Sequence, residues 1–302
     1  MAEVVPPSTL VAGEGIGQRR ARALLGWLSE PEAVTMLLGR APLPTDELSS
    51  LKQIAVTCRE AVASRPLFAD RDPVRPTTDR RLLDLAERQE LRAHFHGFDW
   101  RPAMVDLTQV LSFQKLINAE GLDERLGNAK GFDLNRLLEI CLPSSQPLPP
   151  VGAFADADGK GFTISSLNPN LRIAAGHLSE ASVSPAPGVP PVRAQAVTLL
   201  ITMGTSYVQV ARYRDRYFLR DGYHRTAALL RRRITEAPCV LIEARSFEQL
   251  GCPPGSFSYE VLFGDRPPYL RDFWNDDTSR EIAQVATRKV IRVRGEEFVV
   301  PR

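Results

Sequence analysis

The segment FLRDGYHRTAALLRRR, residues 218–233, combines residue types that can hold an anion with the pattern of a strand, a turn and a helix. We expect the strand to end at Arg220, the turn to lie at Asp221 and Gly222, and the helix to begin at about Tyr223. Glycine in the turn permits backbone conformations that other residues avoid. The pattern therefore predicts a helix N-terminus that opens above the end of a strand.

The first turn of this helix carries the expected chemistry. The backbone amides of His224, Arg225 and Thr226 should lack intrahelical acceptors and point toward one space, together with the positive end of the helix dipole. Arg225 can add a bidentate contact to a phosphate or carboxylate, and His224 can donate a hydrogen bond or move a proton near neutral pH. His224 and Asp221 are therefore candidate catalytic residues beside a candidate phosphate site.

Neighbouring residues extend the candidate site. Arg212 and Arg220 flank the turn on adjacent predicted strands. Tyr223 can either stack on a nucleotide base or pack against a proline-rich loop at residues 178–195, which we expect to be able to cover a site. The structural alternative is that Asp221 caps the helix and the arginines form a solvated face. The candidate phosphate or nucleotide ligands are Arg212, Arg220, Gly222, Tyr223, His224, Arg225 and Thr226.

The motif DGYHRTAALLRRRITEAPCVLIEA, preceded by YVQVARYRDRYFLR, resembles the core of the ParB/sulfiredoxin-like superfamily over residues 207–244. Members of that superfamily place a GxxR signature at the start of a helix after a strand, and Gly222, His224 and Arg225 match it, with Asp221 matching the DGxxR forms. The resemblance implies that this turn holds the phosphates of a nucleotide or of nucleic acid. Tyr223 stands where sulfiredoxin has its catalytic cysteine and ParB its glutamate, so the resemblance implies neither sulfinic acid reduction nor centromere binding.

The charge distribution favours an anionic partner for the same segment. The 302 residues sum to +2, but residues 207–233 contain eight arginines and two aspartates, so this window carries 8 − 2 = +6 and the remainder about −4. The small total charge argues against a broad DNA footprint. The favoured prediction is therefore a protein that binds a phosphate-bearing ligand, either a nucleotide or nucleic acid.

Two other functions remain open from the sequence. A nucleotide-dependent phosphotransferase or NTPase would use the same site, with a nucleotide, Mg²⁺ and a carboxylate such as Asp221. A non-catalytic interaction module would keep the turn as architecture and dock a protein partner through its N-terminal helical region, residues 1–97. No cofactor beyond a nucleotide with Mg²⁺ is indicated.

Other motifs give weaker signals. Asp156 and Asp158 resemble the start of a calcium loop, but two required oxygen ligands are missing, so a hairpin turn is expected. The glycines of GEGIG, residues 13–17, and the pair His94 and His96 do not have the spacing of a nucleotide loop or of a metal site. We predict no metal site.

The composition is that of a globular protein, with 43% hydrophobic and 25% charged residues. No segment has the length and apolarity of a membrane span, and the first residues lack a signal-peptide pattern, so we expect no membrane association and a cytoplasmic location. The four cysteines have no CxxC pairing, which predicts reduced and mostly packed thiols.

The predicted fold class is α+β, with an N-terminal helical region at residues 1–97, a ParB/sulfiredoxin-like mixed αβ core at 98–250 and a C-terminal extension at 251–302 packed on the core. In the first region, helices are expected after residue 17, after Ser29, after Thr45 and over 79–95.

Within the core and the extension, the patterns predict individual elements. We expect a strand at 104–112, a helix at 132–142 capped by Asp133, a hairpin at 151–167 and a central buried strand at 196–204. A second hairpin should turn at Arg214 and Asp215. A strand at 237–244 follows the motif helix, and a short helix near 280–287 precedes a closing strand pair, 290–295 with 296–302.

Overall fold

The computed structural model is a mixed α/β protein that contains several sheets. It describes residues 18–39, 45–122, 126, 131–144, 151–156, 159, 161–166, 171–184, 186–203, 205–285, 289–296 and 299. The chain divides into two compact units. Unit 1 comprises Met1–Gly17, Ser145–Thr205 and Ala286–Arg302, and unit 2 comprises Gln18–Ser144 and Ser206–Val285. Residues 98–250, expected to form one core, therefore contribute to both units.

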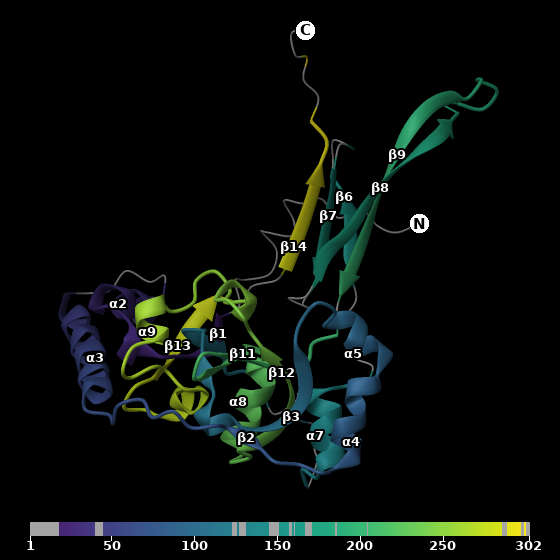
Figure 1. Cartoon of the computed structure of the whole chain (residues 1–302). Helices are drawn as coiled ribbons and strands as arrows, with labels where there is room; N and C mark the ends of the chain where they lie inside the picture. Colours follow the sequence, from purple (N-terminus) through teal and green to yellow (C-terminus); the bar gives the residue numbers. More distant parts are fainter. Residues whose placement is uncertain are drawn as a thin grey trace. The chain divides into compact units, whose positions relative to one another are not determined.

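Unit 2 is built on a six-stranded sheet with the strand order β2-β3-β12-β10-β11-β4. Figure 1 labels β2, β3, β11 and β12 of this sheet. The strands are β2 Val74–Arg75, β3 Trp100–Asp106, β4 Leu111–Ser112, β10 Gln209–Tyr213, β11 Arg216–Asp221 and β12 Glu236–Glu243. β10 and β11 form the expected hairpin through Arg214, whose φ of 54° suits the tight turn. β10 runs parallel to β12, and β11 runs parallel to β4.

A second sheet of unit 2 has the order β13-β1-β5, from β1 Gln18–Ala23, β5 Leu116–Asn118 and β13 Arg280–Val285. Helices were expected after residue 17 and near 280–287, and both expectations are wrong. In β1, Ala21 and Ala23 are buried, whereas Arg20, which precedes Ala21, is exposed. Alternation with a period of two suits a strand. Both strands pair with segments far away in the sequence, which local helix signals do not report.

Helices of unit 2 pack around these sheets. They are α2 Glu30–Leu38, α3 Thr45–Ala63, α4 Arg80–Leu83, α5 Gln89–His94, α7 Leu134–Cys141, α8 Tyr223–Arg231 and α9 Tyr259–Leu262, with short 3-10 helices at Leu25–Trp27, Asp84–Glu87, Leu107–Gln109, Glu248–Leu250 and Leu270–Trp274. Ser29 and Asp133 cap α2 and α7 as expected, each accepting from a backbone amide. The single helix expected over 79–95 is divided into α4, a 3-10 turn and α5.

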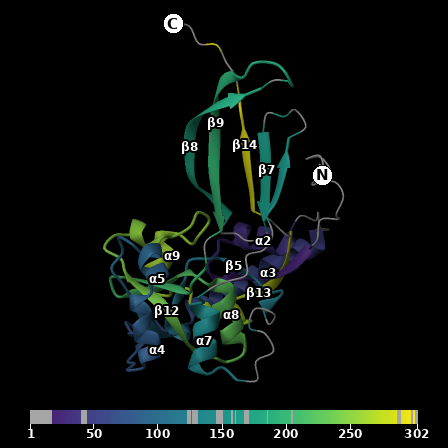
Figure 2. The ribbon, with the colours of Figure 1, turned by 90° about the vertical axis from the view of Figure 1, so that its right-hand side faces the viewer.

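The described residues of unit 1 form two sheets (Figures 1 and 2). One has the order β14-β7-β6, from β6 Gly152–Ala155, β7 Gly161–Ser166 and β14 Lys289–Arg294, and it includes the expected hairpin at 151–167. The other is a ribbon of two long antiparallel strands, β8 Leu171–Val183 and β9 Val192–Met203. β14 is a strand as expected, but it pairs with β7, whereas its expected partner segment includes residues outside the described ranges.

The ribbon overturns two expectations. The segment at 196–204 was expected to be a central strand buried on both sides, yet β9 is partly to fully exposed along its length and pairs with β8. The tract at 178–195 was expected to be a loop, yet its first residues complete β8 and its last begin β9, so that only the tip is irregular. An apolar run indicates a strand but not what covers it.

The cysteines lead to a first testable prediction. Cys58, Cys141 and Cys239 are buried free thiols in the core of unit 2, and Cys252 is partly exposed. Burial raises the pKa of all three buried thiols, that of Cys141 to about 12. A thiol reagent at neutral pH should therefore modify Cys252 alone in the native protein, and all four cysteines after denaturation. Rapid modification of a second thiol in the folded protein would contradict this packing.

Candidate functional site

The motif forms the expected strand, turn and helix in unit 2. β11 ends at Asp221, Gly222 has a φ of 97° in the left-handed region, and α8 begins at Tyr223. A Cβ atom at position 222 would lie 2.9 Å from Cγ2 and 3.0 Å from Cα of Val208 on the neighbouring chain segment. Glycine is therefore required here both by the backbone conformation and by the close approach of Val208.

Asp221, Ser206 and Arg225 form one hydrogen-bond network behind this turn. Asp221 Oδ1 accepts from the amide of Gly222 at 2.6 Å, and Asp221 Oδ2 accepts from the hydroxyl of Ser206 at 2.9 Å. Nη2 of Arg225 donates to Oγ of Ser206 at 2.6 Å. Ser206 thus connects the two motif residues, although no sequence pattern singled it out.

Arg225 is bound to the protein interior. Arg225 is only 8% exposed, and its Nη1 donates to the carbonyl oxygens of Ser206 at 2.7 Å and Ile140 at 3.1 Å. The Ile140 carbonyl belongs to the last turn of α7, so Arg225 ties that helix to the start of the segment that leads into β10. In the structure the guanidinium donates to two main-chain oxygens and to the Ser206 hydroxyl, which gives Arg225 an architectural role in place of the expected bidentate ligand contact.

Tyr223 is also a core residue. It is 5% exposed, its hydroxyl accepts from the amide of Phe113 at 2.8 Å, and it donates to the carbonyl of Leu219 at 2.8 Å. Burial raises the pKa of this phenol above its usual range. Both expectations for Tyr223, stacking on a base and packing on the proline-rich tract, are corrected: the ring fills the core of unit 2 and its hydroxyl joins two backbone groups.

The helix start is more closed than expected. The amides of Arg225 and Thr226 both donate to the carbonyl oxygen of Gly222 at 3.0 Å, and the Thr226 hydroxyl lies within hydrogen-bond distance of the same oxygen at 3.2 Å. Two of the three amides expected to face a ligand therefore have acceptors within the helix. His224 is partly buried in the first turn of α8.

Arg220 occupies a different environment from Arg225. Its guanidinium stacks on the ring of Phe98 at 4.7 Å from the centroid, and a Cβ at Gly251 would lie 2.5 Å from its Nε. Among the described residues, none accepts a hydrogen bond from this side chain or forms an ion pair with it. Partial burial lowers its pKa, because desolvation disfavours the cation more than the neighbouring carboxylate of Asp221 favours it. This is the chemistry of a group that would gain from an anionic ligand.

Most of the other arginines in the basic window lie on aromatic rings of the protein itself. Arg212, which is exposed, lies 5.5 Å from the ring of Tyr217 and 3.8 Å from the carboxylate of Glu243, so its charge has a partner within the sheet. Similar stacking is seen for the pairs Arg214 with Tyr213, Arg216 with Phe68, Arg231 with Trp274 and Arg232 with Phe132. The +6 charge of the window thus serves packing at several positions.

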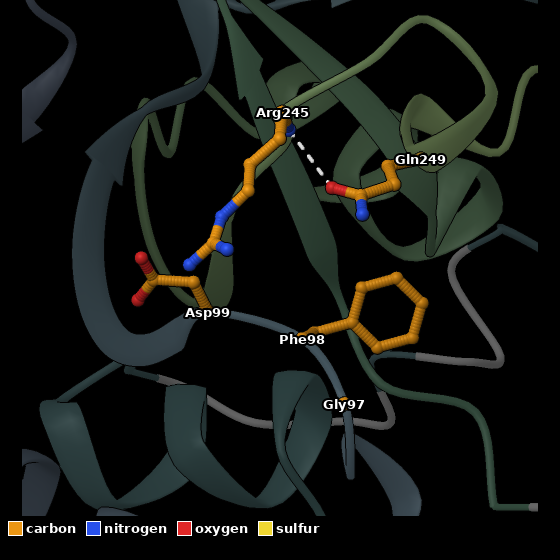
Figure 3. Close-up of a pocket in the computed structure, with 5 residues that line it drawn as sticks. All are labelled: Gly97, Phe98, Asp99, Arg245 and Gln249. Atoms are coloured by element: carbon orange, nitrogen blue, oxygen red, sulfur yellow. Dashed lines mark hydrogen bonds between the residues drawn. The ribbon is translucent and has the colours of Figure 1, made fainter.

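A polar pocket lies next to Arg220. It has a volume of about 450 Å³ and is lined by Gly97, Phe98, Asp99, Arg245 and Gln249 (Figure 3). Figure 3 shows the side chains of Arg245 and Asp99 pointing toward one another, and Oε1 of Gln249 accepts from the Arg245 amide at 2.8 Å. Phe98 is shared between the pocket and the stacking contact of Arg220.

Sequence reasoning missed the pocket residues, although one signal was present. Arg245 follows the end of β12, and residues beyond strand ends frequently contact ligands. Asp99 immediately precedes β3, and Gln249 lies in the 3-10 helix that follows β12. These segments are separated by nearly 150 positions in the sequence, so their meeting follows from the antiparallel pairing of β3 with β12.

The other motifs do not gather a metal site in the described ranges. There, no three side chains of His, Cys, Asp or Glu lie together in an arrangement that could hold an ion. Asp156 accepts hydrogen bonds from Arg292 and Thr163 of the neighbouring strands in unit 1. His94 packs edge-on against the rings of Phe95 and Tyr207. The glycines of residues 13–17 lie outside the described residues.

Comparison with known proteins adds no relative. The chain matches no protein-family model, no curated protein and no solved structure. Within the described parts of the chain, none of the helices has the length and apolarity needed to cross a membrane. What the fold and the site define is thus a mixed α/β protein in which Arg220, on strand β11 of the motif, stacks on a residue that lines a polar pocket.

Proposed function

We propose that this protein binds a phosphate-bearing ligand at the pocket of unit 2, with Arg220 and Arg245 holding the phosphate. The observation that carries the proposal is the guanidinium of Arg220, which is partly buried and unpaired among the described residues. Partial desolvation of this cation costs free energy that the carboxylate of Asp221 offsets only in part, and a phosphate oxygen would supply both further negative charge and a hydrogen-bond acceptor. Its neighbour Phe98 lines the pocket that Arg245 enters.

The pocket favours a nucleotide over inorganic phosphate. A volume of about 450 Å³ is typical of small-molecule sites and is larger than a phosphate ion needs. Asp99 would repel a bare phosphate, but its carboxylate can accept hydrogen bonds from the amino, ring N–H or hydroxyl groups that a nucleotide carries. Gln249 offers an amide nitrogen for a further polar contact. The resemblance of residues 207–244 to ParB/sulfiredoxin-like cores points to the same ligand class.

His224 and the turn support this site in the proposal. His224 stands in the first turn of α8, three residues after the end of the strand that carries Arg220, and it can donate a hydrogen bond to a phosphate near neutral pH. Asp221 and Arg225 hold the turn in place through Ser206. We do not extend the proposal to phosphoryl transfer, because both carboxylate oxygens of Asp221 already accept hydrogen bonds within the protein.

The test is a thermal-shift series that is monitored by tryptophan fluorescence. The three tryptophans, Trp27, Trp100 and Trp274, all lie in unit 2, so their signal reports that unit. The ligands are ATP, ADP, GTP, CTP, inorganic phosphate and a short DNA, each with and without Mg²⁺. We expect a nucleotide at about 100 times its Kd to stabilise the wild type by about 2.7 kcal/mol.

Single charge removals identify the ligand-binding arginines. Arg220→Gln and Arg245→Gln should weaken nucleotide binding roughly 10- to 100-fold, because each removes a charge-assisted contact. Arg212→Gln is the matched control, since it removes one exposed charge that already has Glu243 as its partner, and it should leave binding unchanged. Binding of DNA alone, falling steeply with salt, would identify nucleic acid as the phosphate source. No shift with any ligand, or equal shifts in all variants, would refute the site.

A further inference from the structure

The guanidinium of Arg220 is packed against the backbone of Gly251 as well as against the ring of Phe98. A Cβ atom at position 251 would lie 2.5 Å from Nε, 3.1 Å from Cζ and 3.2 Å from Nη2 of Arg220. Cβ atoms in proteins essentially never come within 3.0 Å of another atom in this way. Only glycine at position 251 therefore leaves the guanidinium where it is.

Gly251 is held in place by the short 3-10 helix that precedes it, Glu248–Leu250. Gly251 ends this helix with a φ of 67°, and its amide donates to the carbonyl oxygen of Glu248 at 3.1 Å. Leu250 is fully buried in the core of unit 2, so the backbone beside it cannot withdraw from Arg220 without disturbing that core. The surface that Gly251 presents to Arg220 is therefore fixed.

The segment from Arg245 to Gly251 contributes to the site in two ways. Arg245 and Gln249 line the pocket, whereas Gly251 contacts Arg220 and is not one of the lining residues. Gly251 can therefore act on a ligand only through Arg220. An arginine side chain has several rotatable bonds, and the freedom that it loses on binding opposes the affinity. Contacts that restrict the side chain beforehand reduce this loss.

We propose that Gly251 is a positioning residue of the phosphate site, which together with Phe98 holds the guanidinium of Arg220 in one orientation before the ligand binds. The inference rests on the proposed function, because it concerns the arginine that would hold the phosphate. Within the part of the chain that the structure describes, the N–H groups of this guanidinium have no acceptor, so the oriented group keeps its donors for a ligand. Residues that fix the geometry of a binding group in this way increase affinity without touching the ligand.

The variant Gly251→Ala tests the positioning role. The atoms that its Cβ would meet belong to the end of a flexible side chain, so the guanidinium should move and the backbone should stay. Gly255→Ala is the matched control, because Gly255 also lies in unit 2 and has a φ of 81°, but a Cβ there would meet no atom within 4 Å. Both variants should lower the melting temperature by similar amounts, since each places a Cβ on a left-handed residue.

Nucleotide affinity should separate the two variants. Titration with ATP, ADP, GTP and CTP should give a Kd that is roughly three- to tenfold higher for Gly251→Ala than for Gly255→Ala, because a displaced arginine must be ordered during binding. In an Arg220→Gln background, Gly251→Ala should cause no further loss of affinity, since the side chain that it displaces is absent. A merely structural role of Gly251 would give the same loss in both backgrounds.

NMR of the Arg220 side chain tests the orientation in the free protein. Its Nε–Hε signal, identified by its absence from Arg220→Gln, should have an order parameter above about 0.6 in the wild type and a lower value in Phe98→Leu. The signal should shift in Gly251→Ala and stay in place in Gly255→Ala. A mobile Arg220 in the wild type would overturn the positioning role. The two proposals fail differently: a wild type that binds none of the nucleotides refutes the proposed function, whereas equal affinities of the two glycine variants refute positioning alone.

Discussion

Arg225→Ala should destabilise unit 2 by about 3 to 4 kcal/mol whether or not a ligand is present. The substitution removes a buried guanidinium that donates to Ile140 O, Ser206 O and Ser206 Oγ. It leaves two carbonyl oxygens without this donor in the interior and removes a link between α7 and the segment that leads into β10. Thermal unfolding followed by tryptophan fluorescence should show a melting temperature lower by about 10 °C.

The size of this effect distinguishes a structural role from a ligand contact. Arg225→Lys retains the charge and one donor group, so it should recover only part of the lost stability. Arg220→Gln removes an arginine that donates no hydrogen bond within the described residues and should change the melting temperature of the free protein much less. If Arg225→Ala melted like the wild type and lost only ligand binding, Arg225 would be a ligand contact and the structural assignment would fail.

Gly222→Ala should lower the free energy of unfolding by about 2 to 4 kcal/mol, which is the second large effect. The φ of 97° at this position is unfavourable for any residue with a Cβ, which accounts for about 1 to 2 kcal/mol. The new Cβ would also lie 2.9 to 3.0 Å from atoms of Val208, including its backbone Cα, and relieving that contact requires the turn to move. Movement of the turn would disturb the hydrogen bond between Gly222 and Asp221.

Gly97→Ala is a matched control for the backbone contribution. Gly97 has a comparable φ of 85°, but a Cβ there would meet no atom within 4 Å. Gly97→Ala should therefore lower the free energy of unfolding by about 1 to 2 kcal/mol, the conformational contribution alone. Urea unfolding monitored by tryptophan fluorescence measures both variants in the same unit. Equal losses at the two positions would show that the close approach to Val208 does not matter.

Local patterns predicted the motif region well for a physical reason. The hairpin turn at Arg214, the strand β12 and the start of α8 depend on residues near one another in sequence, and the structure confirms all three. Alternation, turn residues and helix starts are short-range signals. The mixed α/β class followed from them.

Long-range contacts explain what the sequence did not reveal. One acceptor of Arg225 is the carbonyl oxygen of Ile140, 85 positions away. The residues next to Arg225 in the sequence therefore could not show that its guanidinium has acceptors inside the protein. The segment at 196–204 is apolar, which predicts a strand, but apolarity alone does not distinguish a buried central strand from an exposed ribbon. The pocket joins residues that precede β3 to residues that follow β12, at the end of the strand pair where the two segments meet. Neither segment carries a recognisable motif.

The placement of β1 between β13 and β5 affects how the chain acquires its structure during synthesis. β1 ends at Ala23, and its partner β13 begins at Arg280. At a translation rate of roughly 5 to 20 residues per second, β13 is synthesised roughly 10 to 50 s after β1, and one edge of β1 stays unpaired for that time. Arg19, Arg20 and Arg22 occupy that strand, and their charges disfavour pairing with other nascent chains. The arginines of β1 thus protect an edge that stays open until the end of the domain has been made.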